Sequence, residues 1–140
     1  RFGICPPKLQ LQRRSFAVLS HMWVGDAPVN PQQRQRVGVI MHGILGSKAN
    51  WKTPAKQLHA RLEASAGWRL LLVTHRGHHE SPGGEVPHTL EACANDVIET
   101  LAAAGVDIDS EELDLFVCGH SFGGKVALML AKLRKEAGKP

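Results

Sequence analysis

The 140-residue sequence has no tyrosine, few aromatic residues of any kind and only three cysteines, Cys5, Cys93 and Cys118. An odd number of cysteines without C-x-x-C spacing indicates neither a disulfide framework nor a cysteine zinc site. No apolar run approaches the roughly 20 residues that a membrane-spanning helix requires, and the N-terminus lacks the apolar region of a secretory signal. These absences predict a soluble intracellular protein with reduced thiols and no membrane span.

Long runs of one charge are also missing. The formal net charge is +4, and the basic residues form no stripe interleaved with aromatic residues, so the sequence predicts no nucleic-acid binding. Hydrophobic residues make up 43% of the chain, which is enough for one core and indicates one domain or part of one.

The N-terminal segment, residues 1–35, is basic at its start. Four basic residues and no acidic residue precede Asp26, a bias that organelle transit peptides share. A mitochondrial or plastid targeting remnant is one interpretation, and otherwise the protein is expected in the cytoplasm. The other interpretation is a basic loop ahead of the first strands, since "SFAVLSHMWV" at residues 15–24 is strand-like.

Three later apolar runs have the length of strands and are apolar enough to be buried on both faces. They are "VGVIM" at 37–41, "WRLLLVT" at 68–74 and "LDLFVC" at 113–118. Helical patterns alternate with them, which predicts the α/β class with a mostly parallel sheet and helices on both faces.

Capping residues and apolar spacing define the three helices. Ser47 or Asn50 can cap the first, which ends near Gly67, and Thr89 can cap the second, which ends near Gly105. The predicted apolar faces contain Trp51, Ala55, Leu58 and Leu62 in the first helix, Leu90, Cys93, Ala94, Val97, Ile98 and Leu101 in the second, and Val126, Leu130 and Leu133 in the third.

The third strand leads into the pattern G-x-S-x-G, formed by Gly119, His120, Ser121, Phe122 and Gly123. Between a strand and a helix this pattern is typical of a nucleophilic serine on a sharp turn, where flanking glycines avoid clashes. A phosphate-binding turn is the first alternative, but Val126 follows Lys125 where a phosphate loop has a hydroxyl residue. An ordinary tight turn is the second alternative.

A His-Gly pair, His42 and Gly43, follows the strand at 37–41. Hydrolases with a nucleophilic elbow place one oxyanion donor in such a loop and the other directly after the serine, which predicts the backbone N–H groups of Ile44 and Phe122 as the oxyanion hole. His42 is expected to support the loop by hydrogen bonding. It is not expected to be the general base, because in hydrolases with such an elbow the catalytic acid and histidine follow the serine in sequence.

With these residues the sequence resembles the α/β-hydrolase superfamily, and within it a branch of small serine esterases that includes bacterial esterases and a mitochondrial hydrolase. The resemblance covers about residues 36–134 and is carried by "HGILGSKANW" (42–51), "HRGHHESP" (75–82) and "GHSFGGK" (119–125). The middle segment departs from the family pattern D-x-R-N-H-G-x-S-P at three positions, Thr74, Gly77 and His79.

The resemblance implies a serine hydrolase that cleaves a small carboxylic ester or thioester through an acyl-enzyme on Ser121. The usual catalytic acid and histidine are not found after Ser121, where Glu136 is the one acidic residue. Residues 36–140 are therefore expected to be the N-terminal half of a longer hydrolase domain, with the first five of about eight strands, and to be inactive alone. The alternative is a truncated, non-catalytic binding module.

No cofactor is required by the proposed chemistry, and no oligomeric state is indicated. His75, His78 and His79 form a cluster that invites a metal hypothesis, but it lacks an acidic or cysteine partner at an established spacing. The acidic loop at 107–112 lacks the alternating ligands and the glycine of a calcium loop, so a solvated connection is favoured there. The sequence thus predicts no metal site.

Overall fold

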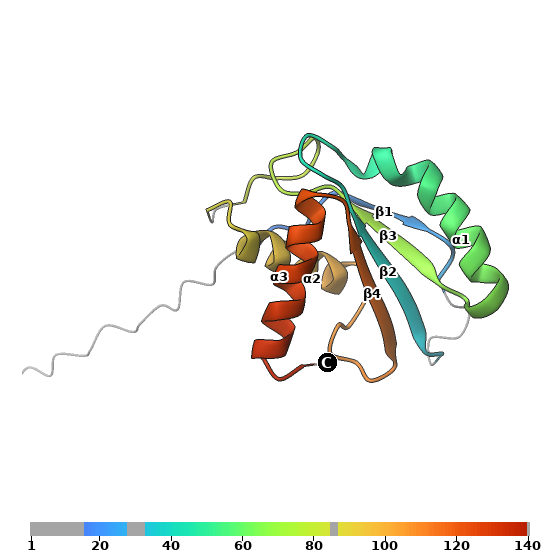
Figure 1. Ribbon diagram of the computed structural model, residues 1–140. Coiled ribbons are helices and arrows are strands. Elements are labelled where there is room, and N and C mark those ends of the chain that lie inside the picture. Colours follow the sequence, from blue (N-terminus) through green and yellow to red (C-terminus); the bar gives the residue numbers. More distant parts are fainter. Residues whose placement is uncertain (1–15, 28–32, 85–86, 140) are drawn as a thin grey trace, which may run out of the picture.

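The computed structural model describes residues 16–27, 33–84 and 87–139 (Figure 1). The elements along the chain are β1 (His21–Val24), β2 (Gln35–Met41), the short 3-10 helix η1 (Lys48–Trp51), α1 (Lys52–Ala66), β3 (Arg69–Val73), α2 (Leu90–Ala103), β4 (Leu113–Gly119) and α3 (Phe122–Glu136). The predicted targeting remnant falls largely on residues 1–15, which lie outside the described residues. The strand-like stretch after them does contain a strand, β1.

The four described strands form one sheet in the order β1-β3-β2-β4. Strands β2, β3 and β4 are parallel, whereas β1 pairs with β3 in the antiparallel direction. This arrangement confirms the predicted α/β class with a mostly parallel sheet. The resemblance implied five strands, and the described residues contain one fewer.

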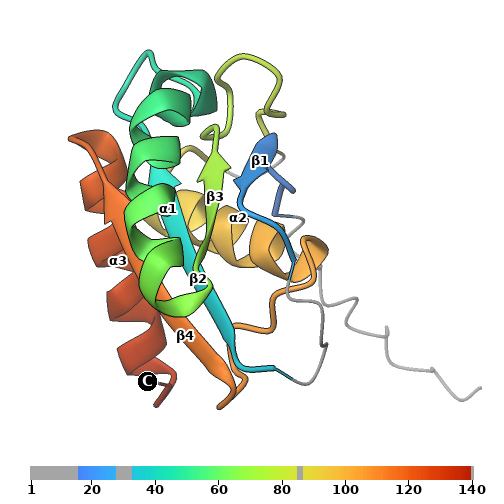
Figure 2. The same ribbon diagram turned by 90° about the vertical axis from the view of Figure 1, so that its right-hand side faces the viewer.

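Helices cover both faces of the sheet, with α1 on one side and α2 and α3 on the other (Figures 1 and 2). Side chains along β2 point alternately to the two faces of the sheet and pack against the helices on each face. Val37, Val39 and Met41 pack toward α2 and α3, whereas Ile40 belongs to the cluster that includes Ala55 of α1. Because each central strand is apolar on both faces, it is buried between the two layers.

The predicted helix signals are present in the structure. Ser47 and Asn50 together form a capping box at η1, and Thr89 accepts a hydrogen bond from the N–H of Ala92 at the start of α2. Helix α1 ends at Gly67, whose left-handed backbone (φ 64°) suits a residue without Cβ. No helix in the described part of the chain is long and apolar enough to cross a membrane.

One residue of the predicted apolar face of α1 lies at the margin of that face. Leu58 is 37% exposed, whereas Ala55 is fully buried. At about 100° per residue, Leu58 lies some 60° around the helix from Ala55 and reaches the margin of the face.

Candidate active site

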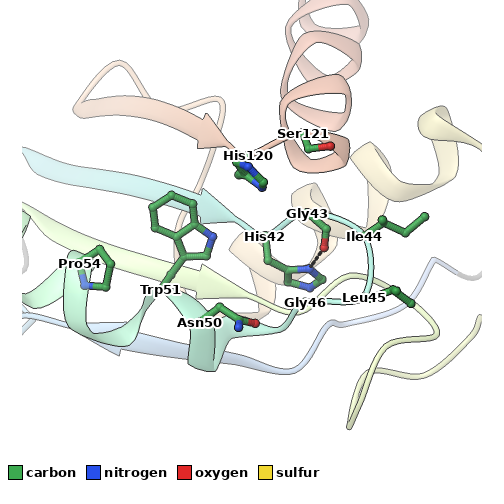
Figure 3. Close-up of a pocket in the computed structure, with 10 residues that line it drawn as sticks. All are labelled: His42, Gly43, Ile44, Leu45, Gly46, Asn50, Trp51, Pro54, His120 and Ser121. Carbon is green, nitrogen blue, oxygen red and sulfur yellow. Dashed lines mark hydrogen bonds between the residues drawn. The ribbon is translucent and has the colours of Figure 1, made fainter.

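The carboxyl ends of β2, β3 and β4 meet at one edge of the sheet. There the loop after β2, η1, the start of α1 and the turn after β4 line a pocket of about 560 Å³ (Figure 3). In Figure 3, Ser121 comes from the start of α3, whereas His42 and Ile44 come from the loop after β2. The pocket is lined by His42, Gly43, Ile44, Leu45, Gly46, Asn50, Trp51, Pro54, His120 and Ser121.

Ser121 lies at the junction between β4 and α3 with an unusual backbone conformation. Its φ of 52° and ψ of −109° place it in a region that residues with a side chain rarely adopt. The side chain is exposed and makes no capping hydrogen bond with its own helix. The hydroxyl is therefore free to meet a ligand in the pocket.

Glycines make this turn sterically feasible. A Cβ atom on Gly119 would lie 2.2 Å from the carbonyl carbon of Gly123, and a Cβ atom on Gly123 would lie 2.7 Å from the carbonyl oxygens of both Met41 and His42. Backbone atoms cannot approach so closely without a shift of the chain. The glycines predicted as supports of the motif thus allow α3 to start directly against β4 and the end of β2.

The backbone N–H groups of Ile44 and Phe122 have no acceptor among the described residues. Ile44 is 69% exposed and lines the pocket with Ser121, and Phe122 follows Ser121 as the first residue of α3. Intrahelical bonding starts after them, where the N–H of Gly124 donates to the carbonyl of Ser121 at 3.0 Å. The N-terminus of α3 also contributes the positive end of its helix dipole at this point.

His42 is buried and both of its ring nitrogens are engaged. The backbone N–H of His75 donates to Nε2 of His42 at 2.9 Å, so Nε2 carries a lone pair and the proton is on Nδ1. Nδ1 lies 2.6 Å from the carbonyl oxygen of Gly43, to which it donates (Figure 3). Burial lowers the pKa of His42, which favours this neutral ring.

The loop after β3 supports the loop after β2 at a second point. His78 lies with Nδ1 3.0 Å from the carbonyl oxygen of Arg76 and accepts a long hydrogen bond, 3.4 Å, from the N–H of Leu45. The Nε2 atom of His75 lies 3.1 Å from the carbonyl oxygen of His42. Nitrogens of the histidine cluster thus bind backbone groups, and the described residues contain no group of three or more potential metal ligands.

A buried ion pair anchors the same loop to α2. Arg76 donates to both carboxylate oxygens of Asp96 at 2.5 Å, and both side chains are almost completely buried. The paired Asp96 raises the pKa of Arg76 further, so the guanidinium stays charged. Sequence reasoning missed this pair. Its signal was an acidic residue, Asp96, inside the apolar stretch that forms the core side of α2.

The three departures from the family pattern have local structural consequences. Thr74 accepts a hydrogen bond from the N–H of Lys48 at 3.0 Å through its hydroxyl oxygen. Gly77 has a φ of 68°, and His79, where the family usually has glycine, has a φ of 44°. The turn is thus retained with a strained histidine at a position that favours glycine.

Comparisons with known proteins agree with this architecture. The model of the alpha/beta hydrolase family matches residues 39–138. The sn-1-specific diacylglycerol lipase ABHD11 of Mus musculus is 34% identical over 70% of this chain, and a probable alcohol acetyltransferase of Saccharomyces cerevisiae is 32% identical over 66%. The chain spans 28% of the length of the mouse protein and 25% of the yeast protein.

Solved structures show the same fold. A marine microorganism esterase superposes with a TM-score of 0.65 at 24% identity, over 85% of this chain and 38% of the esterase. The enol-lactonase of Burkholderia xenovorans LB400 superposes with a TM-score of 0.62 at 21% identity, over 82% of this chain and 38% of the lactonase. On the family match and the shared sheet, the chain belongs to the alpha/beta hydrolase family.

Proposed function

We propose that the protein is a serine hydrolase that cleaves a carboxylic ester or a thioester through an acyl-enzyme on Ser121. The observation that carries the proposal is the position of Ser121, exposed on a strained turn at the start of α3 and lining one pocket with Ile44.

In the proposed reaction the Ser121 hydroxyl oxygen attacks the acyl carbon and loses its proton to a base. The carbonyl oxygen becomes an oxyanion, which the N–H groups of Ile44 and Phe122 stabilise. Collapse of this intermediate expels the alcohol or thiol, which takes the proton, and water then releases the acid from the acyl-enzyme. No metal or organic cofactor takes part in these steps.

The base and the acid that orients it are proposed to come from outside these 140 residues. Both follow the serine in this fold, and no histidine or aspartate follows Ser121 here. His42 is a poor substitute because Nε2 accepts from the chain and Nδ1 donates to it.

The walls of the pocket favour a substrate with an apolar acyl group. Ile44, Leu45, Trp51 and Pro54 contribute carbon-rich side chains to the pocket. The mouse relative is named as a diacylglycerol lipase and the yeast relative as a probable acetyltransferase, so both names describe reactions of acyl groups with oxygen nucleophiles. A small ester or thioester of a fatty or shorter acyl group is therefore the proposed substrate class.

The test is the variant Ser121→Ala in the full-length protein, assayed with p-nitrophenyl esters and with a fluorophosphonate probe. We expect kcat to fall by about 10⁴-fold or more and labelling to disappear, because the attacking oxygen is lost. Ser110→Ala, which changes a serine in the loop before β4, is the control and should retain both activities. Ester turnover that survives in Ser121→Ala would refute the proposal.

The alternative raised by the sequence, a non-catalytic binding module, predicts no reaction at Ser121. Labelling of extract from the source cells distinguishes the two. A labelled Ser121 peptide from a parent protein well above 15.2 kDa supports the hydrolase. An unlabelled, stable parent of about that mass supports the binding module.

A further inference from the structure

His75 has no role in the chemistry proposed above, yet it occupies the centre of the site's supporting structure. It is completely buried at the end of β3. Its ring centroid lies 4.6 Å from that of His42 and 5.0 Å from that of Phe122, and both contacts are edge-to-face. His75 therefore contacts His42, which lies two residues before the proposed donor Ile44, and Phe122, which is the other proposed donor.

His75 and His42 are joined by two hydrogen bonds in opposite directions. The backbone N–H of His75 donates to Nε2 of His42, and Nε2 of His75 lies 3.1 Å from the carbonyl oxygen of His42. A carbonyl oxygen only accepts, so Nε2 of His75 carries the proton. Burial lowers the pKa of His75 to about 4, which is consistent with a neutral ring.

Two hydrogen bonds to carbonyl oxygens fix the peptide planes on both sides of Gly43. His75 holds the carbonyl of the His42–Gly43 peptide, and His42 holds the carbonyl of the Gly43–Ile44 peptide. In a trans peptide the N–H points away from the carbonyl, so fixing the Gly43 carbonyl also fixes the direction of the Ile44 N–H. The orientation of the Ile44 N–H thus depends on His75, which lies 31 positions later in the chain.

The second donor is reached through the Phe122 ring. The edge-to-face contact with His75 restricts the side chain of the residue whose N–H opens α3. The carbonyl oxygen of His42 also lies against Gly123, the next residue of the helix. The buried imidazole of His75 therefore contacts His42, in the loop that contains Ile44, and also contacts Phe122.

We propose that His75 is a positioning residue that holds the Ile44 and Phe122 N–H groups in register for the oxyanion. This inference rests on the serine hydrolase function proposed above. The alternative is that His75 only fills space. Its Nδ1 atom is buried without a partner among the described residues, so an apolar ring of similar size would fill the space without that unsatisfied atom.

Three variants of His75 in the full-length protein separate these roles. Glutamine places an amide nitrogen where Nε2 lies, asparagine places one where Nδ1 lies, and phenylalanine keeps the ring but has no donor. We expect His75→Asn and His75→Phe to lower kcat by about 10- to 100-fold with KM nearly unchanged, because misaligned donors weaken transition-state binding. His75→Gln should retain kcat within about threefold of the wild type.

The measurements are kcat and KM for a p-nitrophenyl ester and the midpoint of thermal unfolding, with His88→Asn, an exposed histidine, as the matched control. Wild-type kcat in all three His75 variants would overturn the positioning role. Losses of kcat that are equal in the three variants and accompany equal losses of Tm would overturn it too. Ser121→Ala is measured in parallel. Ester turnover that survives in Ser121→Ala would overturn the hydrolase proposal and the positioning role with it. An inactive Ser121→Ala together with fully active His75→Asn and His75→Phe would overturn the positioning role alone.

Discussion

The two turns that meet at the pocket are held in place by different means. The turn after β4 is held by backbone contacts: the N–H of Gly123 donates to the carbonyl of His120 at 3.0 Å, the N–H of His120 donates to the carbonyl of Met41 at 3.1 Å, and glycines allow the close approach. The loop after β2 is held by His75 and His78, which belong to the loop after β3.

The difference separates an element held by backbone contacts from one held by the side chains of another loop. The serine turn requires glycine at fixed spacing, so its sequence and its geometry are closely coupled. The loop that contains Ile44 instead requires a neighbouring loop to be in place, together with the correct histidine tautomers. Substitutions of the glycines in the first element should therefore act on folding, and substitutions of His75 behind the second should act first on activity.

The largest effect is expected from Gly119→Ala, which introduces a methyl group into the turn after β4. The new Cβ would lie 2.2 Å from backbone of Gly123, and backbone cannot move aside as a side chain can. We expect the free energy of unfolding to fall by about 4 to 5 kcal/mol, at the extreme for one substitution. Urea denaturation followed by circular dichroism measures it.

Gly67→Ala is the control, because Gly67 has a positive φ of 64° but nothing within 4 Å of the position of a Cβ. It should lose only about 1 to 2 kcal/mol, which is the cost of the left-handed backbone. Equal losses in the two variants would contradict the steric explanation, because Gly119 does not share the positive φ of Gly67.

The next largest effect is expected from Arg76→Met, which detaches the supporting loop from α2. Asp96 would remain buried without its cation, at a cost of about 3 to 4 kcal/mol in unfolding free energy. The double variant Arg76→Met/Asp96→Leu should recover part of this loss, since no buried charge remains. A double variant less stable than Arg76→Met would contradict the explanation.

A smaller effect is expected from pH. The pKa of His75 is about 4 in the folded protein, against an ordinary value near 6.5, so the unfolded chain binds a proton first as the pH falls. Stability from the neutral ring is complete above about pH 6.5 and is lost between there and about pH 4, by up to about 3 kcal/mol.

Urea denaturation at several pH values measures this dependence, with His75→Gln as the comparison because glutamine does not titrate. His75→Gln should show a shallower loss of stability between pH 6.5 and 4. Part of the slope should remain, since burial also lowers the pKa of His42. The same slope in both proteins would show that His75 is protonated in the folded state over this range.

The sequence by itself determined the alternation of strands and helices, the caps at Ser47, Thr89 and Gly67, and the turn around Ser121. Each of these depends on residues close together in the chain, where turn geometry and helix capping follow directly from residue type. It did not determine the exposure of Leu58, because a helix pattern does not show how wide the buried face is.

Only the tertiary structure decided the hydrogen bonds between His42 and His75 and the ion pair between Arg76 and Asp96. In the sequence, the histidines at 75, 78 and 79 indicated neither a metal site nor the hydrogen bonds that they form in the fold. The tautomer and the neutral charge of a histidine depend on burial and on the donors that surround it, and these come from strands that meet only when the sheet forms.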